Sequence, residues 1–464
     1  MPEIPLEMIL KATGGRLSGG PAPEVMRGVS TDTRAITAGA LFVALRGEQF
    51  DGHDFLADAF RRGAAAALVS REVAAPGPLV MVEDTLAALG AMAAALRESL
   101  SVSVIAITGS LGKTTTKELA ASILSRGLRT ARTPGNYNNE IGVPLALLEL
   151  DRSYRAAVVE MAMRGRGQIA YLARMAKPQV GVVTNIGVSH LELLGSREAI
   201  AEAKSELLAA LPPDGTAVLN ADDEFFGFLR ERSPARVVSF GREAEADVRA
   251  SNVRATAEGW VTFDLCGWWG AREVSLAAAG RHQALNAAAA AAAAMAAGAE
   301  PEWVWEGLAS FHGAEMRGEI SQAPGGYTVI DDCYNAAPDS MRVALELLAD
   351  LPGRRRWAVL GDMKELGPMG PEWHREVGEL VAALGISGLV TVGELAAYIA
   401  DGAGEALGGA AVRARDNEEA TAALRARLGR GDVVLVKGSR AMQMEQIVQR
   451  LLAEATAGEG EDNG

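Results

Sequence analysis

The chain has 464 residues, more than one ordinary hydrophobic core serves, so its length favours about three domains. Hydrophobic residues make up 49% of the sequence and charged residues 22%, as is usual for a soluble globular protein. The net charge is −14 and no basic stripe is present, which argues against nucleic-acid binding. An anionic ligand must therefore be held locally, by backbone amides, a few Lys or Arg side chains, or metal ions.

Cysteine usage and apolar runs exclude two further classes of protein. Neither Cys266 nor Cys333 belongs to a CxxC or Cys/His cluster, so no zinc site is expected. A disulfide between the two cysteines remains an alternative. The first fifteen residues lack the basic and apolar regions of a signal peptide. The most apolar run, residues 287–298, is alanine-rich and too short to span a bilayer. We expect a cytoplasmic protein that is not membrane-inserted, with a close-packed buried helix at that run.

The first block, residues 1–98, is expected to be a mixed α/β domain. An apolar strand is predicted over 41–45 and ends at Gly47. A helix is predicted over 53–62 and a second strand over 64–69.

The second and third blocks alternate strands with helices, which is typical of parallel sheets covered on both faces. In the second block, residues 99–312, strands are predicted at 102–107, 156–159 and 180–184. In the third block, residues 313–464, strands are predicted at 328–330, 357–360, 388–392 and 433–436, and helices at 340–348 and 378–384. The prediction is a three-domain α/β protein whose last domain is an open, Rossmann-like sheet.

A glycine-rich turn follows the first strand of the second block and reads IAITGSLGKTTTK over 105–117. Backbone amides around Gly109 to Gly112 can cradle phosphate oxygens at the start of a helix. Lys113 can neutralise the β- and γ-phosphates, and the Thr114 hydroxyl can bind Mg²⁺. The spacing departs from the usual P-loop, because Ile107 stands where the first glycine is expected. The order of strand, glycines, Lys-Thr and helix still predicts an ATP site.

Two further polar residues follow strands of the same sheet. Glu160 ends one strand and His190 comes shortly after another, so both are expected at the carboxyl edge beside the phosphate loop. A carboxylate and an imidazole there can complete a magnesium site. Taken alone, His190 is more often structural than a ligand. Lys204 lies in the helical stretch AEAKSELL, and by itself this pattern is typical of a solvated surface lysine.

The motif TGSLGKTTTKE resembles the Mur ligase family of ATP-dependent carboxylate–amine ligases. Further segments resemble the branch that adds a dipeptide: DTR at 32–34, LFVALRGEQFDGHDF at 41–55, NNEIGVPLALL at 138–148, IDDCYNAAPDSM at 330–341, VLGDMKELG at 359–367 and VLVKGSRAMQME at 434–445. The resemblance thus extends over essentially the whole chain.

The resemblance implies three domains that hold a UDP-sugar peptide, ATP and an incoming dipeptide in turn. It implies two Mg²⁺ ions bound by Thr114, Glu160, His190 and a carbamylated Lys204, with Lys113, Lys204 and His190 as catalytic residues. The nucleotide contacts that it implies are Gly109, Ser110, Leu111, Gly112, Lys113, Thr114, Thr115, His282, Asn286, Arg317 and Asp332. The substrate contacts that it implies are Asp32, Thr33, Arg34, Arg46, Asn138, Asn139, Tyr334 and Asn335.

The activity implied is ligation of D-alanyl-D-alanine to UDP-N-acetylmuramoyl-tripeptide through an acyl phosphate, by a monomer. Whether the third residue is diaminopimelate or lysine is open. The sequence departs from the family pattern at Ala162, Gln168, Gln283 and Ala337, and the last of these affects the acceptor side. The alternatives are a sibling ligase, such as the one that adds the third residue or folylpolyglutamate synthase, and a non-catalytic nucleotide-binding regulator.

Overall fold

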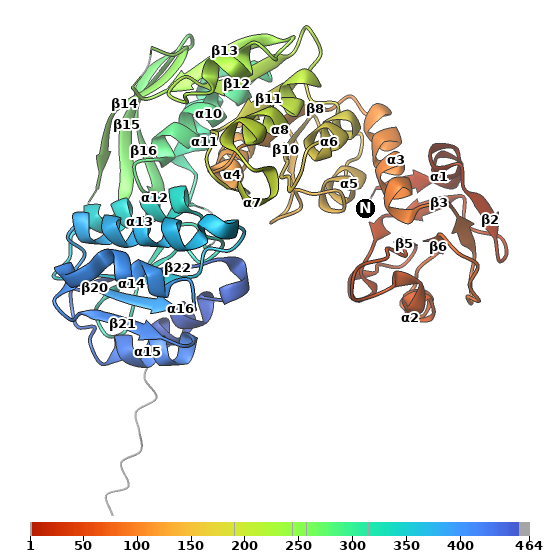
Figure 1. The fold of residues 1–464 in the computed structure, drawn as a ribbon. Coiled ribbons are helices and arrows are strands. Elements are labelled where there is room, and N and C mark those ends of the chain that lie inside the picture. The colour runs from red at the N-terminus through yellow and green to blue at the C-terminus, as the bar shows by residue number, and fades with distance from the viewer. Residues whose placement is uncertain (1, 190, 244, 257, 314–315, 454–464) are drawn as a thin grey trace, which may run out of the picture.

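The computed structural model describes residues 2–189, 191–243, 245–256, 258–313 and 316–453. Its strands form a two-stranded and a five-stranded sheet near the N-terminus, a nine-stranded sheet, and a six-stranded sheet towards the C-terminus. The first and last parts of the chain lie at opposite ends of the molecule, with the nine-stranded sheet and its helices between them (Figure 1). The predicted three-part α/β fold is confirmed. Each predicted block contains its own sheets, while the boundaries at 98 and 312 stay predictions.

The N-terminal block has a two-stranded sheet, a five-stranded mixed sheet and three α-helices. Its strands are β1 (Glu3–Pro5), β2 (Arg16–Ser18), β3 (Val25–Arg27), β4 (Val29–Ser30), β5 (Leu41–Val43), β6 (Ala66–Val69) and β7 (Leu79–Met81), and its helices are α1 (Leu6–Thr13), α2 (Leu56–Arg61) and α3 (Thr85–Glu98). The predicted helix over 53–62 is divided, because Asp51 accepts a hydrogen bond from His53 N and starts a 3₁₀ turn at Gly52–Phe55 before α2.

Helix α3 joins the N-terminal block to the central block. It packs on α5 (Gly142–Leu148) and α6 (Gln168–Ala176), and its buried apolar side chains share one core with them. The buried Arg97 guanidinium caps the end of α6. It donates from Nε to Ala176 O at 2.9 Å and from Nη1 to Leu100 O at 3.1 Å. The carbonyl end of a helix carries partial negative charge, so this cation fixes α3 against α6.

The central sheet has the strand order β16-β15-β14-β13-β12-β11-β8-β10-β9. Its strands are β8 (Ser103–Thr108), β9 (Thr130–Arg132), β10 (Ala156–Glu160), β11 (Val180–Val183), β12 (Thr216–Asn220), β13 (Arg236–Gly241), β14 (Val248–Ala255), β15 (Trp260–Gly267) and β16 (Gly270–Ala279). The pairs from β9 to β14 are parallel, and those of β14, β15 and β16 are antiparallel. The predicted parallel sheet is present, and three antiparallel strands that the sequence did not predict extend it at one edge. Buried and less buried residues alternate along β15, as in a strand with one solvated face.

The alanine-rich run lies in α10 (Gln283–Ala296), and Ala287 to Ala294 have no exposed surface. This confirms the predicted buried helix. Methyl side chains let α10 approach the sheet and α4 (Lys113–Leu124) closely, and α11 (Pro301–Ala309) also packs on α4. The remaining helices of the block are α7 (Leu191–Leu194), α8 (Arg197–Ala209) and α9 (Phe226–Arg230).

The C-terminal block is an open sheet of order β17-β18-β22-β19-β20-β21, with β17 antiparallel at one edge. Its strands are β17 (Glu319–Gln322), β18 (Thr328–Asp331), β19 (Arg356–Gly361), β20 (Gly388–Val392), β21 (Ala411–Ala414) and β22 (Val433–Lys437). Its helices are α12 (Pro338–Asp350), α13 (Gly370–Ala383), α14 (Ala397–Ala403), α15 (Asn417–Arg425) and α16 (Glu445–Leu452). The predicted helix over 378–384 begins earlier, because Pro371 is compatible with the first turn of α13.

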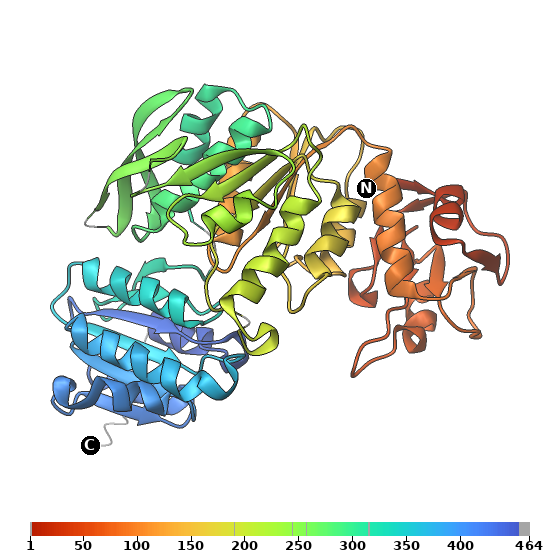
Figure 2. The ribbon, with the colours of Figure 1, turned by 45° about the horizontal axis from the view of Figure 1, so that its top comes forward.

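The C-terminal block packs against one end of the central block, and α12 lies on the side that meets it (Figure 2). Loops at the carboxyl ends of β8 and β10 therefore face those that follow β18, β19 and β22. Within the described residues, no helix is long and apolar enough to cross a membrane.

Candidate active site

The phosphate loop connects β8 to α4, and two of its glycines adopt backbone conformations that side chains disfavour. Gly109 has φ 148° and Gly112 has φ 78°. A Cβ atom on Gly109 would overlap Thr184 Oγ1, and one on Gly112 would overlap Asn286 Oδ1. Glycine is required at both positions by backbone conformation and by space. The turn therefore brings backbone closely against the neighbouring strand and against α10.

Hydrogen bonds from the residues after β11 hold the loop in shape. Ser110 N donates to Asn185 O at 3.0 Å, and Leu111 N donates to Asn185 Oδ1 at 2.9 Å. Lys113 Nζ donates to Gly109 O at 2.8 Å. Burial lowers the pKa of Lys113, the Glu160 carboxylate opposes that shift, and the Arg317 charge adds to it. The ammonium lies at the start of α4, where an anionic ligand would also meet the positive end of the helix.

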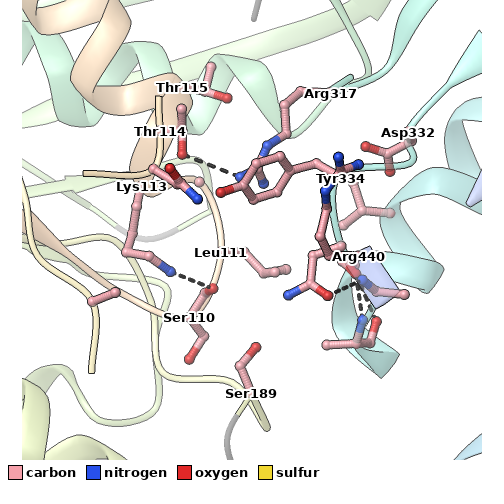
Figure 3. Close-up of a pocket in the computed structure, with 18 of the residues that line it drawn as sticks. Ser110, Leu111, Lys113, Thr114, Thr115, Ser189, Arg317, Asp332, Tyr334 and Arg440 are labelled. Atoms are coloured by element: carbon pink, nitrogen blue, oxygen red, sulfur yellow. Dashed lines mark hydrogen bonds between the residues drawn. The ribbon is translucent and has the colours of Figure 1, made fainter. Parts of the chain in front are cut away.

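A cleft of about 820 Å³ lies between the central and C-terminal blocks. Predicted site residues from both blocks line it: Ser110, Leu111, Gly112, Lys113, Thr114, Thr115, Asn138, Asn139, Glu160, His282, Asn286, Arg317, Asp332, Tyr334 and Asn335. In Figure 3 the phosphate-loop residues stand on one side of this cleft, and Asp332, Tyr334 and Arg440 on the other. The structure thus brings together segments that are more than 200 residues apart in the sequence.

Glu160 is buried and lines the cleft, and its carboxylate accepts hydrogen bonds from a hydroxyl and an amide. Thr114 Oγ1 donates to its Oε2 at 2.9 Å, and Asn138 Nδ2 donates to its Oε1 at 2.7 Å. The buried Lys117 ammonium lies 3.9 Å from Oε2. Carboxylate and hydroxyl oxygens are hard donors of the kind that Mg²⁺ prefers. The donor set therefore fits a magnesium ion that would also bind phosphate oxygens and water.

The described residues contain no group of three or more His, Cys, Asp and Glu side chains that could hold a metal by themselves. His190, the predicted imidazole ligand, lies outside the described residues. The other ligands of such an ion would have to come from Thr114, from bound phosphate, or from a modified side chain. Glu160 and Thr114 would supply only part of a coordination sphere.

Lys204 lies in α8 and has 2% of its surface exposed. The interpretation of its pattern as a solvated surface lysine is therefore wrong, because α8 turns this residue inward. Among the described residues no hydrogen-bond acceptor or carboxylate is paired with it. Burial lowers its pKa well below the ordinary value, and the charge of Lys113 lowers it further. The amine is consequently neutral and nucleophilic at a pH where an exposed lysine would be charged.

Asn286 and Arg317 both contact the segment of the phosphate loop and the start of α4. Asn286 is buried, lies against Gly112, and its Nδ2 donates to Gln283 Oε1 at 2.9 Å. It therefore does not simply face outward from the alanine-rich helix. Arg317 Nη2 donates to Thr114 Oγ1 at 3.3 Å, and its guanidinium lies 3.9 Å from the centre of the Tyr334 ring. Stacking on an aromatic face leaves the guanidinium edge available to phosphate or ribose oxygens.

His282, at the start of α10, lines the central-block side of the cleft. Protein atoms surround the imidazole on most sides, although part of its surface faces the cleft. Burial lowers its pKa to about 4, and the charges of Lys437 and Arg242 contribute. The ring is therefore neutral near pH 7 and can act as a hydrogen-bond donor or acceptor there.

The C-terminal side of the cleft is organised by Lys437. Its ammonium lies 2.7 Å from Asp332 Oδ2 and donates to Asn335 O at 2.8 Å, so it holds the β18 and β22 loops together. Ala337 cannot cap α12 with its own side chain. Ser340 Oγ accepts from Ala337 N at 2.9 Å instead. The departure at Ala337 thus leaves the helix start intact but removes a polar side chain from the cleft.

The predicted contacts of the N-terminal block lie elsewhere. Asp32, Thr33, Arg34 and Arg46 lie at the ends of β4 and β5, and none of them lines the cleft. Arg34 is exposed and forms an ion pair with Asp32, whose Oδ1 also accepts from Arg34 N at 2.9 Å. The pair is a preformed polar patch on a block separate from the cleft.

Sequence reasoning missed several residues that line the cleft, among them Asn136, Glu140, Ser189, Lys364, Glu365 and Ser439. Ser439 Oγ accepts from Lys364 N at 2.8 Å, which joins the loops after β19 and β22. These two loops carry the segments GDMKELG and KGSRAMQME. The segments supported the resemblance, but they contained no recognised chemical pattern that would have marked single residues.

Three family descriptions match this chain in succession. Residues 25–97 match the Mur ligase family catalytic domain, residues 107–294 the Mur ligase middle domain, and residues 316–440 the Mur ligase glutamate ligase domain. Together they cover most of the chain in the order that the three blocks follow.

The relatives extend over nearly the whole length. The chain is 43% identical to UDP-N-acetylmuramoyl-tripeptide–D-alanyl-D-alanine ligase of Synechocystis, over 92% of each chain. It is 37% identical to the ligase of the same name of Bacillus subtilis, over 92% of this chain and 93% of the relative. Among solved structures, MurF of Acinetobacter baumannii superposes with a TM-score of 0.90 at 34% identity, covering 97% of this chain and 99% of the other.

A second solved structure bears on the nucleotide site. MurF ligase of Thermotoga maritima, solved in complex with ADP, has a TM-score of 0.81 at 31% identity and covers 92% of this chain and 97% of that one. A relative of this fold therefore binds an adenine nucleotide. The glycine turn and Lys113 of the present chain are suited to the same kind of ligand.

Proposed function

Because the chain belongs to the Mur ligase family, we infer that it joins D-alanyl-D-alanine to UDP-N-acetylmuramoyl-tripeptide with hydrolysis of ATP to ADP. One observation carries the inference: the phosphate loop, Lys113 and the Thr114–Glu160 pair face the C-terminal block across one cleft. A nucleotide held by the loop would point its terminal phosphate into that cleft. Two further substrates can then meet at the transferred group.

The chemistry requires activation because a carboxylate is a poor electrophile. A terminal carboxylate oxygen of the tripeptide attacks the γ-phosphorus of ATP, the bond to the β–γ bridging oxygen breaks, and ADP leaves. The dipeptide amine then attacks the acyl carbon of the resulting acyl phosphate. The tetrahedral intermediate loses phosphate, and the nitrogen loses its proton. ADP, phosphate and one new peptide bond are the products.

This chain's residues act mainly by position and charge. The Lys113 ammonium neutralises charge on the transferred phosphoryl group, and backbone amides of residues 109–114 supply fixed dipoles at the start of α4. We propose that His282, Asn286, Arg317 and Asp332 hold the nucleotide, and that Asn138, Asn139, Tyr334 and Asn335 line the path of the joining substrates. Closure of the C-terminal block over the cleft would exclude water from the acyl phosphate.

Two Mg²⁺ ions belong to the proposal, and when bound they supply neutralisation of phosphate charge. Thr114 and Glu160 would hold one of them. The buried neutral amine of Lys204 is suited to attack CO₂, forming a carbamate with loss of one proton. That anionic group could ligate a second ion together with His190. The low pKa of Lys204 and its lack of a described counter-ion support this modification.

The N-terminal block completes the proposal. Asp32, Thr33, Arg34 and Arg46 would bind the UDP-sugar end of the tripeptide precursor. Their position at the carboxyl ends of β4 and β5 supports this role, because that edge of a parallel sheet is where ligands bind. We also propose a monomer that works in the cytoplasm, where nucleotide-linked precursors are available. Sedimentation velocity of the purified chain tests the oligomeric state.

The test is phosphate release from ATP by purified protein with Mg²⁺ and UDP-N-acetylmuramoyl-tripeptide, with and without D-alanyl-D-alanine. Release that depends on both substrates, with a product heavier by one dipeptide less water, is the expected result. Tripeptides ending in diaminopimelate and in lysine are run side by side to identify the third residue. Release only with UDP-muramoyl-dipeptide would contradict the proposal and indicate a sibling ligase.

An isotope label tests the intermediate. A tripeptide with ¹⁸O in its terminal carboxylate is expected to transfer one labelled oxygen to inorganic phosphate. Label found in AMP would refute the acyl-phosphate route.

A non-catalytic regulator is tested by Lys113→Ala, with Lys11→Ala on the exposed end of α1 as the control. Loss of turnover in Lys113→Ala alone is expected. Equal turnover in both variants would contradict the assignment of the site.

A further inference from the structure

A short loop after β11, residues 185–188, lies between the phosphate loop and the C-terminal block. Its backbone is held at successive residues. Gly187 N donates to Ser110 Oγ at 2.8 Å, and Ile186 N donates to Asp223 Oδ2 at 2.7 Å. Val188 N donates to Asp339 Oδ2 at 3.0 Å. The first two partners belong to the central block, whereas Asp339 belongs to α12 of the C-terminal block.

Asp339 occupies the first turn of α12, directly after Pro338. An aspartate in the first turn of a helix is usually explained by the helix's own amides. Here Asp339 Oδ2 instead accepts from the backbone of the central block, so α12 lies directly against the 185–188 loop. A Cβ atom on Gly187 would overlap Asp339 Oδ2 and lie 3.2 Å from Ser110 Cβ. Glycine at 187 therefore lets the loop fit between the phosphate loop and α12.

The segments on both sides of Val188 in the sequence belong to the cleft or to the phosphate loop's support. Towards the N-terminus, Asn185 holds the amides of Ser110 and Leu111 in the phosphate loop. Towards the C-terminus, the loop continues into Ser189, which lines the cleft on the same side as Ser110 (Figure 3). One carboxylate of the C-terminal block thus meets the segment that shapes the phosphate loop. The same helix begins immediately after Asn335 to Ala337, which line the acceptor side of the cleft.

We propose that Asp339 is a positioning residue for the ligation: its hydrogen bond to Val188 N sets the C-terminal block in register with the phosphate loop. The carboxylate does not touch the reacting atoms. It orients the acceptor side of the cleft with respect to the nucleotide, so that the dipeptide amine and the activated carboxyl group meet. This role rests on the ligase function proposed above, and it adds a residue to which the sequence motifs assign no role.

The test compares three variants in steady-state kinetics with ATP, Mg²⁺ and both peptide substrates. Asp339→Ala removes the acceptor atom, while Asp339→Asn removes the charge but keeps an oxygen that can accept from Val188 N. The matched control is Asp350→Ala at the other end of α12. Asp350 also joins the two blocks, through an ion pair with Arg281 at 2.7 Å, but it lies at the far end of α12 from Asp339 and, among the residues that the structure describes, bonds no backbone amide of the 185–188 loop.

The expected loss in kcat for Asp339→Ala is roughly ten- to a hundredfold, since misplacement of reacting groups by about 1 Å has effects of that order. Asp339→Asn and Asp350→Ala should stay within about threefold of the wild type, because neither removes the acceptor to Val188 N. The affinity for ADP alone should stay within about threefold of the wild type in all three variants, because none of them removes a residue that is proposed to hold the nucleotide. A loss shared equally by Asp339→Ala and Asp350→Ala would overturn the proposal, as would a full loss in Asp339→Asn.

Hydrogen exchange separates this proposal from the ligase function. Faster deuterium uptake in the peptide containing Val188 is expected in Asp339→Ala, and wild-type uptake in Asp339→Asn. This readout needs no turnover, so it remains decisive if the wild type proves to be a different ligase. Unchanged uptake in Asp339→Ala would refute the contact. If Asp339→Ala does not fold, Asp339→Leu expressed and measured in the same way replaces it.

Discussion

Substitution of Gly112 by alanine is the change whose cost the structure defines most directly. Gly112 has φ 78°, a left-handed conformation that costs a residue with a Cβ atom about 1–2 kcal/mol. The added methyl group would overlap Asn286 Oδ1. Asn286 is buried and bonded to Gln283, so moving it away loses a hydrogen bond of about 1 kcal/mol.

The two effects sum to roughly 2–3 kcal/mol against the loop conformation that cradles phosphate. Each 1.4 kcal/mol is a factor of about ten in binding, so ATP affinity should fall roughly 30- to 140-fold. Titration calorimetry with ATP and Mg²⁺ measures the affinity. Urea unfolding on the same samples measures whether the strain instead destabilises the whole chain.

Gly14→Ala is the matched control for backbone strain. Gly14 ends α1 with φ 65°, yet a Cβ atom there would meet nothing within 4 Å. Gly14→Ala should therefore show the strain without steric overlap, and ATP affinity should not change. If Gly112→Ala binds ATP within about threefold of the wild type, the reasoning from conformation and space is wrong, because the two effects together predict more than a tenfold loss.

Three further predictions concern buried groups. Lys204→Met should abolish turnover yet raise the unfolding temperature near pH 7 without CO₂, because burial lowers the pKa of the folded-state amine below that of the unfolded chain and so costs stability at that pH. This gain should shrink as the pH rises towards about 10, and an unchanged Tm at pH 7 would refute it. Arg97→Met should lower the free energy of unfolding by about 2–4 kcal/mol, since the carbonyls of Ala176 and Leu100 lose a charged donor. Urea unfolding measures this free energy, and a change below about 0.5 kcal/mol would contradict the prediction. Ala290→Val should destabilise the folded chain by about 1–3 kcal/mol, because the larger side chain overpacks the contacts of α10. Ala297→Val, at the less buried C-terminal end of that helix, should have no such effect, and equal effects of the two variants in urea unfolding would show that α10 is not tightly packed.

The sequence by itself determined the local features whose cause is local. Alternation of apolar runs with helical periods identified β8, β10 and β11 to within two residues. It did the same for β18, β19, β20 and β22 of the C-terminal sheet, but it missed the edge strands β17 and β21. A tract of methyl side chains could only be a helix that another element approaches closely, and α10 is one. The glycines, Lys113 and Thr114 were identified because phosphate binding requires those residue types in that order.

Only the tertiary structure decided which residues meet and which are buried. The residues around Lys204 are typical of a solvent-exposed helix face, so its burial follows from how α8 packs and not from its neighbours in the sequence. The antiparallel strands β14 to β16 join the parallel sheet at an edge that local pattern does not specify. Asp339 and Val188 are 151 residues apart, and their hydrogen bond exists because two separately folded blocks dock. Sequence periodicity reports the environment of one element, whereas a cleft between blocks is a property of their relative position.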